Sequence, residues 1–276
     1  MDNEVYSHGH HESVVSAHAV RTAADSAPHL LPHLAAGQRL LDVGCGPGSI
    51  TLDLARLVAS PDGSGRAIGV DRSEDVLATA RARAAEEGVR NADFETGNIY
   101  DLQYDDGSFD IAHAHQVLHH LADPVAAVRE LRRVTAPGGL VALREADYAA
   151  MSWYPDNPAL DRWREVYDSI SRSNGAEPNA GRRLLSWALD AGFDPAELQV
   201  SASTWIHGTD ATRRTFGLGW ADRALHSSYA GQALERGFAD QEALEGIAAG
   251  WRHWAADPSG VFVMPSVELI AHVGED

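Results

Sequence analysis

The run LLDVGCGPGSIT, residues 40–51, constrains the fold of this chain more than any other stretch. An apolar segment leads directly into Gly44, Gly46 and Gly48, and a helical pattern begins at the next residue. Glycine permits tight turns and a close approach of the backbone to a ligand, while the first turn of a helix presents unpaired N–H groups. The run therefore predicts a strand, a ligand-binding loop and a helix, as in nucleotide-binding α/β folds.

The residues around this run alternate between short apolar segments and longer amphipathic ones. Strands are expected at 38–44, 65–71, 92–97, 108–114 and 139–145, and helices at 49–59, 73–88 and 123–139. Ser73 and Asp123 are suited to cap the second and third of these helices, and Pro124 fits a first helical position. Strands that alternate with helices at this spacing predict a parallel sheet with helices on both faces.

The pattern changes after residue 146. Helices are expected at 158–173 and 180–191, a strand at 197–206, a long helical stretch at 209–256 and a closing strand at 261–273. Helices inserted between the last two strands are suited to cover a substrate. We interpret residues 1–276 as one domain, with an N-terminal lid (1–36), a core (37–147) and a substrate-side half (148–276) that carries a helical insertion at about 207–258.

Charge and cysteine content narrow the function. Forty acidic against 22 basic residues give a formal charge of −18, which repels phosphate backbones and favours a small-molecule substrate over nucleic acid. The single cysteine, Cys45, excludes a disulfide framework and a thiolate metal cluster. The polar N-terminus and the lack of a run of 18 apolar residues indicate a cytoplasmic protein without a membrane span. A monomer or homodimer is expected.

Two details refine the prediction for the glycine loop. Ser49 stands where the third glycine of the dinucleotide fingerprint would fall, and no lysine is present for a Walker-type phosphate site. Asp71 ends the second expected strand, where a carboxylate can accept two hydrogen bonds from a ribose diol. The alternative is that the glycines form a plain turn and that Asp71 caps a helix, although Ser73 already fills that role.

Four runs together resemble class I S-adenosylmethionine-dependent methyltransferases, and most of all the branch grouped with ubiquinone and menaquinone biosynthesis. The runs are LLDVGCGPGSIT, AIGVDRSEDVLATARARA, TGNIYDLQYDDGSFDIAHAHQVLHHLADP and LRRVTAPGGLVALRE, within roughly residues 38–147. The resemblance implies an α/β, Rossmann-like, doubly wound fold with a mostly parallel seven-stranded sheet, an antiparallel last strand, and helical lids at both ends of the chain. It also implies S-adenosylmethionine as cofactor and S-adenosylhomocysteine as product.

The resemblance implies roles for the residues near the cofactor. The three loop glycines would hold its methionine part, Asp42 would orient the amino group, Asp71 would bind the ribose, and Arg72 would flank the adenine. Asn98 occupies a position that is often acidic in the family, and its carbonyl can still accept a hydrogen bond from the adenine amino group. The other implied contacts are Gly97 and Ile99 at the base, and His115 and Gln116 near the methionine and the reacting methyl group.

The stretch YSHGHHESVV, residues 6–15, precedes this core. In proteins related to the family the segment before the first strand closes the cofactor crevice, so we interpret Tyr6, His10 and His11 as lid residues that face the sulfonium and the substrate. Arg21 is expected to pair with the methionine carboxylate. A metal site is disfavoured, because no carboxylate pattern completes the clustered histidines. An inert tail is the alternative that remains.

Methyl transfer from a sulfonium mainly requires that nucleophile and methyl group are held in line and that water is excluded. A general base is needed only if the acceptor must lose a proton, and His115, His11 and Glu145 are candidates for it. Candidate substrate contacts are His10, His11, Tyr148, Trp153, Trp205, Phe216 and Trp220. The tryptophans can instead form the core of the insertion, and His113, His119 and His120 are expected to be structural.

The sequence therefore predicts methyl transfer to oxygen, carbon or nitrogen of a small organic molecule. Two alternatives stay open: methylation of a peptide or protein side chain or carboxylate, and a cyclase-like protein that binds S-adenosylmethionine without transferring its methyl group. A nicotinamide-dependent oxidoreductase is disfavoured by Ser49 and by the matches beyond the loop.

Overall fold

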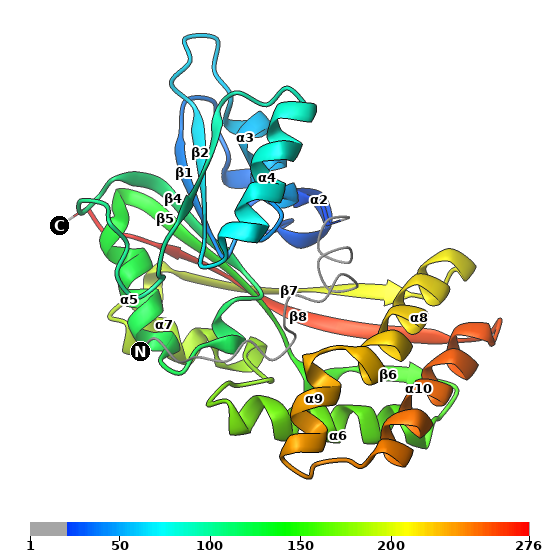
Figure 1. Cartoon of the computed structure of the whole chain (residues 1–276). Coiled ribbons are helices and arrows are strands. Elements are labelled where there is room, and N and C mark those ends of the chain that lie inside the picture. The colour runs from blue at the N-terminus through cyan, green and yellow to red at the C-terminus, as the bar shows by residue number, and fades with distance from the viewer. Residues whose placement is uncertain (1–20, 276) are drawn as a thin grey trace.

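An eight-stranded sheet forms the centre of the computed structural model, which describes residues 21–275 (Figure 1). Its strand order is β3-β2-β1-β4-β5-β8-β6, and β7 pairs with β8. The parallel strands are β1 (Arg39–Val43), β2 (Arg66–Asp71), β3 (Ala92–Thr96), β4 (Phe109–His115) and β5 (Thr135–Ala146). The strand β8 (Val261–His272) runs antiparallel to β5, β6 (Ser152–Tyr154) and β7 (Leu198–His207).

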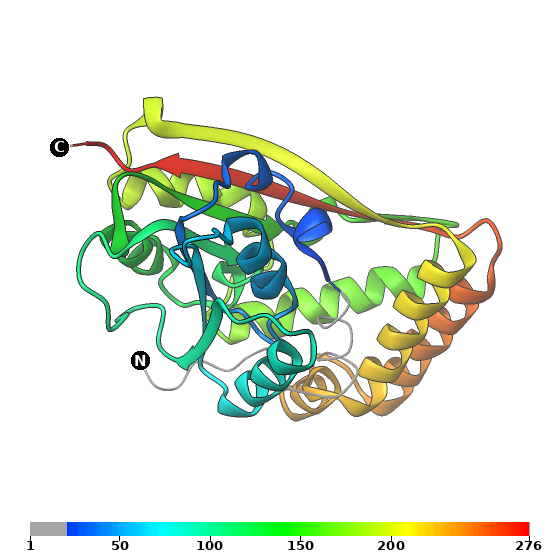
Figure 2. The ribbon, with the colours of Figure 1, turned by 90° about the horizontal axis from the view of Figure 1, so that it is seen from above.

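The predicted Rossmann-like α/β fold with an antiparallel last strand is confirmed, but the sheet has eight strands in place of seven. The additional strand is β6, whose three residues pair with the start of β8. Such a short segment leaves no periodic pattern in the sequence. In Figure 2, β7 and β8 run side by side toward the helices at the far end of the sheet.

Helices cover both faces of the parallel strands (Figure 1). The strands alternate their side chains between the two faces, so Leu40 packs toward one helix layer and Leu41 toward the other. The first layer contains α2 (Ala23–Ser26), α3 (Ser49–Val58) and α4 (Glu74–Glu86), and the second contains α5 (Pro124–Val134) and α7 (Leu184–Asp190). This arrangement leaves the carboxyl ends of β1, β2 and β4 to meet at one edge, where ligands bind in such sheets.

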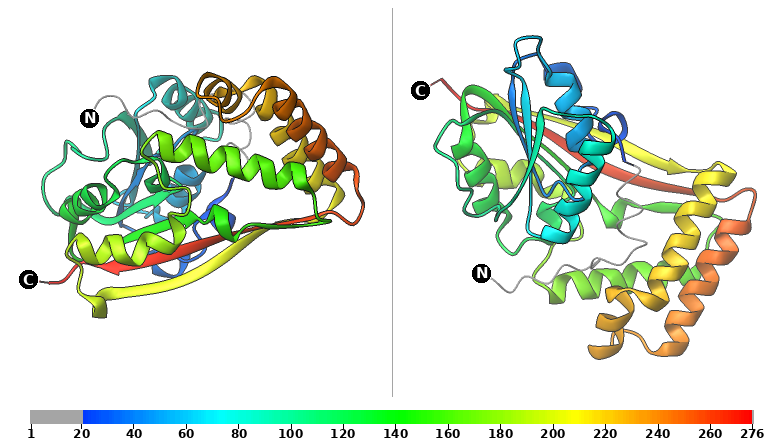
Figure 3. Two further views of the ribbon diagram at one scale, coloured as in Figure 1. Left: turned by 90° about the horizontal axis from the view of Figure 1, so that it is seen from below. Right: turned by 45° about the horizontal axis from the view of Figure 1, so that its top comes forward.

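A second core lies beyond the ends of the parallel strands. It is formed by α6 (Pro158–Ser173), α8 (Asp210–His226), α9 (Ser228–Glu235) and α10 (Gln241–Ala256) with the start of β8 (Figure 3). Its largest buried side chains include Trp163, Trp251, Trp254 and Phe262, whose rings contact one another edge to face. Aromatic burial on this scale is enough to hold the helical unit against the sheet.

The element boundaries follow local chemistry. Ser73 caps α4 through the N–H of Val76, and Asp123 caps α5 with Pro124 at its first position, as predicted. The helix α5 ends at Val134 and not at 139, because Pro137 lacks the N–H that a helix interior needs. The expected helix at 209–256 is divided into three, and the one at 180–191 begins as a 3-10 turn.

Five 3-10 turns complete the described elements: η1 (Leu31–His33), η2 (Leu118–His120), η3 (Tyr148–Ala150), η4 (Gly181–Arg183) and η5 (Pro195–Glu197). Among the helices within residues 21–275, none combines the length and the apolar character that a membrane span requires.

Candidate active site

The three loop glycines share positive φ angles but face different surroundings. Their φ values are 73°, 55° and 78° at Gly44, Gly46 and Gly48. A Cβ atom on Gly44 would lie 2.3 Å from Cγ2 of Val117, and one on Gly48 would lie 2.8 Å from Phe94. A Cβ atom on Gly46 would meet no heavy atom within 4 Å. Gly44 and Gly48 are therefore required by packing, and Gly46 is the glycine beside open space.

Asp71 fixes this loop to the end of β2. Its Oδ2 accepts the N–H of Gly46 at 3.0 Å, and its Oδ1 accepts the N–H of Ser73 at 3.0 Å. Each carboxylate oxygen has a further lone pair after these bonds. The carboxylate is therefore held rigidly next to the open glycine and can still accept hydrogen bonds from a diol. Arg72, the next residue, is exposed.

Asp42 lies beneath the loop, inside the protein. Its Oδ2 accepts a hydrogen bond from the Thr51 hydroxyl at 2.5 Å, and its Oδ1 lies 2.7 Å from Nδ1 of His113. All three side chains are buried, so Asp42 ties β1 to α3 and β4. The prediction that His113 is a core residue is confirmed. A direct contact of Asp42 with a cofactor amino group stays a prediction.

The segment after β3 carries Gly97, Asn98 and Ile99. Asn98 Oδ1 accepts the N–H of Tyr100 at 3.2 Å, and Ile99 is buried in the core on the α5 side of the sheet. Gly97 donates its N–H to the carbonyl of Asp71 at 3.1 Å. The side-chain carbonyl of Asn98 therefore stabilises the turn that Asn98 begins. An adenine amino group that donates to Asn98 would share the Oδ1 atom with the N–H of Tyr100.

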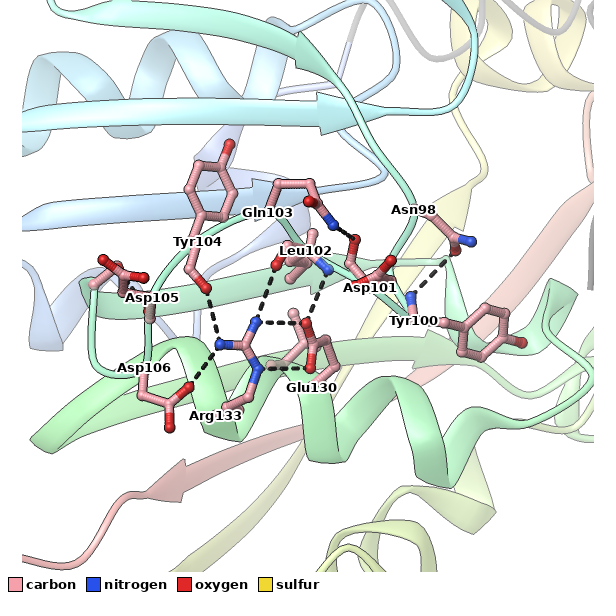
Figure 4. A network of polar contacts seen from close by, with 12 residues as sticks. Asn98, Tyr100, Asp101, Leu102, Gln103, Tyr104, Asp105, Asp106, Glu130 and Arg133 are labelled. Atoms are coloured by element: carbon pink, nitrogen blue, oxygen red, sulfur yellow. Dashed lines mark hydrogen bonds and ion pairs between the residues drawn. The ribbon is translucent and has the colours of Figure 1, made fainter.

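The loop that follows is anchored to α5 by Arg133 and Glu130 (Figure 4). Arg133 donates to both carboxylate oxygens of Glu130 and to the carbonyls of Leu102 and Tyr104. The Arg133 hydrogen bonds lower the pKa of the Glu130 carboxyl. This network is remote from the glycine loop, but it fixes the turn from which Asn98 projects.

The end of β4 presents His115 and Gln116 at the same edge as the glycine loop. Gln116 is the non-glycine residue with a positive φ, 54°, within residues 21–275, and its N–H donates to the carbonyl of Arg144 at 2.8 Å. His115 is 7% exposed, and its ring centroid lies 5.7 Å from that of Trp205. Backbone strain of this kind is concentrated at functional sites, which supports a ligand-binding role for this turn.

Glu145 has a structural role, which corrects its prediction as a proton acceptor. The side chain is 0% exposed and accepts the N–H groups of Val117 and Leu118 at 2.8 and 2.7 Å. Its other oxygen lies 2.6 Å from Nδ1 of His119. A carboxylate that is buried with these partners holds η2 in place, and both of its oxygens are already engaged by protein groups. His119 is structural, as predicted.

The predicted substrate-contacting aromatic residues divide into two groups. Trp220 and Tyr148 belong to the second core, where the rings of Tyr148 and Tyr167 stack with centroids 4.1 Å apart. The prediction that Trp220 and Tyr148 contact the substrate is therefore wrong, because both are core residues. Trp153, Phe216 and Trp205 are only partly buried. The three partly buried rings therefore stay predicted substrate contacts.

The three partly buried rings have distinct partners. Trp153 stacks on Phe262, with ring centroids 5.6 Å apart. Phe216 stacks on His207, with ring centroids 4.0 Å apart. Burial lowers the pKa of His207 to about 4. Trp205 donates its indole N–H to the carbonyl of Asp25 at 2.8 Å.

Tyr6, His10 and His11 lie outside the described residues. Arg21 is described, and its guanidinium carbon lies 4.9 Å from the centre of the Trp205 ring. In residues 21–275 no three His, Cys, Asp or Glu side chains are grouped to bind a metal ion.

One buried residue at this edge was not predicted from the sequence. Arg144 precedes Glu145 on β5, is fully buried and pairs with Glu268 of β8. A charged residue inside the apolar run GLVALRE is a signal that could have identified it, because arginine is rarely buried without a partner.

Comparison with known proteins agrees with this geometry. Residues 34–188 match the family model described as a methyltransferase domain. An uncharacterized methyltransferase of Schizosaccharomyces pombe is 36% identical over 98% of this chain and 96% of its own length. A probable methyltransferase of Aspergillus luteorubrus is 30% identical over 96% of both chains. A demethylmenaquinone methyltransferase of Lactococcus lactis is 36% identical over 43% of this chain and 46% of its own length.

Solved structures share the fold. A putative methyltransferase of Bacillus halodurans has a TM-score of 0.55 and 20% identity, covering 89% of this chain and 98% of that one. The (4+2)-cyclase SpnF has a TM-score of 0.52 and 23% identity, covering 95% of this chain and 81% of that one. On the family model and the relatives, this chain belongs to the class I S-adenosylmethionine-dependent methyltransferases, in the branch of the ubiquinone and menaquinone enzymes.

Proposed function

We propose that this protein transfers the methyl group of S-adenosylmethionine to a small organic acceptor bound between the sheet edge and the helical unit. The observation that carries the proposal is the open position at Gly46, held by a hydrogen bond to Asp71. A loop that admits a ligand at one glycine, beside a fixed carboxylate with remaining lone pairs, fits a nucleoside with an amino acid attached.

The residues of this edge fit the cofactor in three places. Gly46 gives the backbone room to approach its methionine part, and Asp71 has acceptor capacity for the ribose hydroxyls. Asn98 and Ile99 follow β3, where they would border the adenine. When bound, the cofactor supplies a methyl group that its sulfonium already activates.

This chain's own contribution is then to hold the acceptor and to exclude water. The Gln116 turn fixes the end of β4, so His115 projects from a rigid position at the reaction edge. His115 is the described candidate that can accept a proton from an acceptor hydroxyl, because both oxygens of Glu145 are engaged by its three partners. His115 is therefore the residue we assign to any base-assisted step.

The acceptor side supports an aromatic or apolar molecule. Trp205 borders His115, and Trp153 and Phe216 offer partly buried rings from β6 and α8. A ring of the acceptor can stack on such surfaces with little loss of side-chain freedom. Relatives named for the methylation of demethylmenaquinone and phytyl-naphthoquinone act on ring compounds, which is consistent with this choice.

A turnover assay separates this function from its alternatives. The protein is incubated with S-adenosylmethionine and, in separate reactions, with phenols, hydroxy acids, quinols and short peptides, and S-adenosylhomocysteine release is measured. Release that requires a small aromatic compound supports the proposal, and His115→Ala should then lower kcat. Release that requires a peptide would instead indicate peptide methylation. Saturable cofactor binding without release across the whole panel would favour a non-methylating, cyclase-like protein.

A further inference from the structure

A cluster of buried polar side chains lies on the α3 side of the sheet, where β4 and β5 end. Arg144 is level with His115 on β4 and with Glu268 on β8. The Arg144 side chain is 0% exposed, and its Nε donates to Ser203 Oγ at 3.0 Å and to Glu268 Oε1 at 3.3 Å. Its guanidinium carbon lies 4.7 Å from the centre of the Trp205 ring. The sheet therefore places a guanidinium beside the residue assigned to base-assisted transfer.

The outer nitrogens of this guanidinium are not satisfied within residues 21–275. Nη1 and Nη2 of Arg144 are buried and have no hydrogen-bond partner among these residues, and the same holds for both ring nitrogens of His29. The nearest carboxylate is already used, because Glu268 also accepts from Ser201 at 2.9 Å and Ser203 at 2.5 Å. Buried donors without acceptors destabilise a fold, and donors of a charged group do so most. Arg144 therefore has two buried donors for which the described residues supply no acceptor.

Two guanidinium groups lie at this point, together with the carboxylates of Glu268, Asp25 and Glu145, which act electrostatically on Arg144. The guanidinium of Arg21 lies 4.9 Å from the same Trp205 ring, so two arginines contact one indole beside His115. The whole chain carries a formal charge of −18, so its general field does not attract anions. Specific hydrogen bonds and not the general field must therefore select an anion here, and the fork of N–H groups on arginine matches the two oxygens of a carboxylate.

We propose that Arg144 recognises a carboxylate on the methyl acceptor, so that the acceptor is an organic acid with its nucleophile directed toward His115. The inference rests on the proposed methyl transfer and names its substrate class. Nη1 and Nη2 donate to the two carboxylate oxygens, Trp205 supports the adjoining ring, and Glu268 fixes the guanidinium through Nε. The methionine carboxylate of the cofactor is the less suitable partner, since β4 separates Arg144 from the glycine loop after β1.

Binding of a matched pair of probes tests the inference. The protein is first saturated with S-adenosylhomocysteine. It is then titrated by calorimetry at pH 7.5 with 4-hydroxybenzoate and, separately, with 4-hydroxybenzamide. The wild type is expected to bind the acid at least about tenfold more tightly than the amide, as a charge-assisted pair of hydrogen bonds implies. Equal binding of the two probes, or binding of neither to the cofactor-saturated protein, would overturn the inference.

Three variants locate the effect. Loss of Arg144 alone leaves the Glu268 carboxylate buried without its cation, so the main variant is the double substitution Arg144→Met with Glu268→Gln. It should lose the preference for the acid, whereas Glu268→Gln alone should keep it. Arg39→Met, at an exposed arginine that begins β1, is the matched control and should bind as the wild type does.

Titrations with S-adenosylhomocysteine and 5′-methylthioadenosine distinguish a failure of this inference from a failure of the proposed function. Failure of S-adenosylhomocysteine to bind the wild type would contradict the proposed function itself. If the double variant loses affinity for S-adenosylhomocysteine but not for 5′-methylthioadenosine, which lacks the carboxylate, Arg144 serves the cofactor and the inference is wrong. Unchanged affinity for both, together with loss of the acid preference, assigns Arg144 to the acceptor.

Discussion

Substitution of Gly46 by alanine tests the cofactor site against a control that the same chain provides. Gly63, in the turn between α3 and β2, also has a positive φ, 80°, and an added Cβ there would likewise meet no atom within 4 Å. Both substitutions place a side chain in the left-handed region, at a cost of about 1–2 kcal/mol, without a clash. Gly46→Ala and Gly63→Ala should therefore lower Tm by a similar few degrees.

Cofactor affinity should separate the two variants. The methyl group added at Gly46 projects into the space beside Asp71, where crowding of a bound ligand costs about 1–3 kcal/mol, or roughly 5- to 150-fold in Kd. The methyl group added at Gly63 lies in a turn that precedes β2, away from the carboxyl ends of the strands. Calorimetric titration with S-adenosylhomocysteine measures both. Equal Kd values for the two variants would refute the assignment of Gly46 to the cofactor.

Three further predictions concern stability. Burial lowers the pKa of His29 to about 3, so between about pH 6.5 and 3 the unfolded chain binds a proton that the folded chain does not. Stability should fall on acidification, by about 2 kcal/mol between pH 7.5 and pH 5 from this group, and urea unfolding of His29→Gln should lack that part of the decrease. Glu145→Ala removes an acceptor from two backbone N–H groups and should lower the free energy of unfolding by about 2–5 kcal/mol, so a loss below 1 kcal/mol would contradict its structural role. Gly44→Ala collides with Val117, so its loss of Tm should be partly reversed in the double variant with Val117→Ala; additive losses would exclude that contact.

Much of the fold follows from local pattern. The parallel strands were predictable because each is an apolar run followed by an amphipathic helix, and the caps at Ser73 and Asp123 mark where two of these helices begin. The predicted boundary after α5 is wrong because a helical period continues in the sequence up to a proline and two glycines, which lie within the first residues of β5 and not at the end of the helix. The strand β6 was missed because its pairing depends on β8, more than a hundred residues later.

The contacts within the site could not be predicted from the sequence, because the residues that form them lie far apart along the chain. Asp42 and His113 are 71 residues apart, and nothing local indicates that each satisfies the other. The residue type of Glu145 and its place near the end of β5 favour a catalytic role. Its true partners are the amides of the η2 turn, which only the tertiary structure brings into reach. The pairing of Arg144 with Glu268 spans 124 residues.

The most direct test of the account is calorimetric titration of S-adenosylhomocysteine into the wild type, Asp71→Asn and Asp93→Asn. Asp93 lies on β3, paired with Arg66 at the surface, and serves as the control of equal charge. We predict saturable one-site binding to the wild type and to Asp93→Asn, with a Kd at least about tenfold weaker for Asp71→Asn. Absence of binding to the wild type, or equal affinity in all three proteins, would contradict a cofactor site built on Gly46 and Asp71.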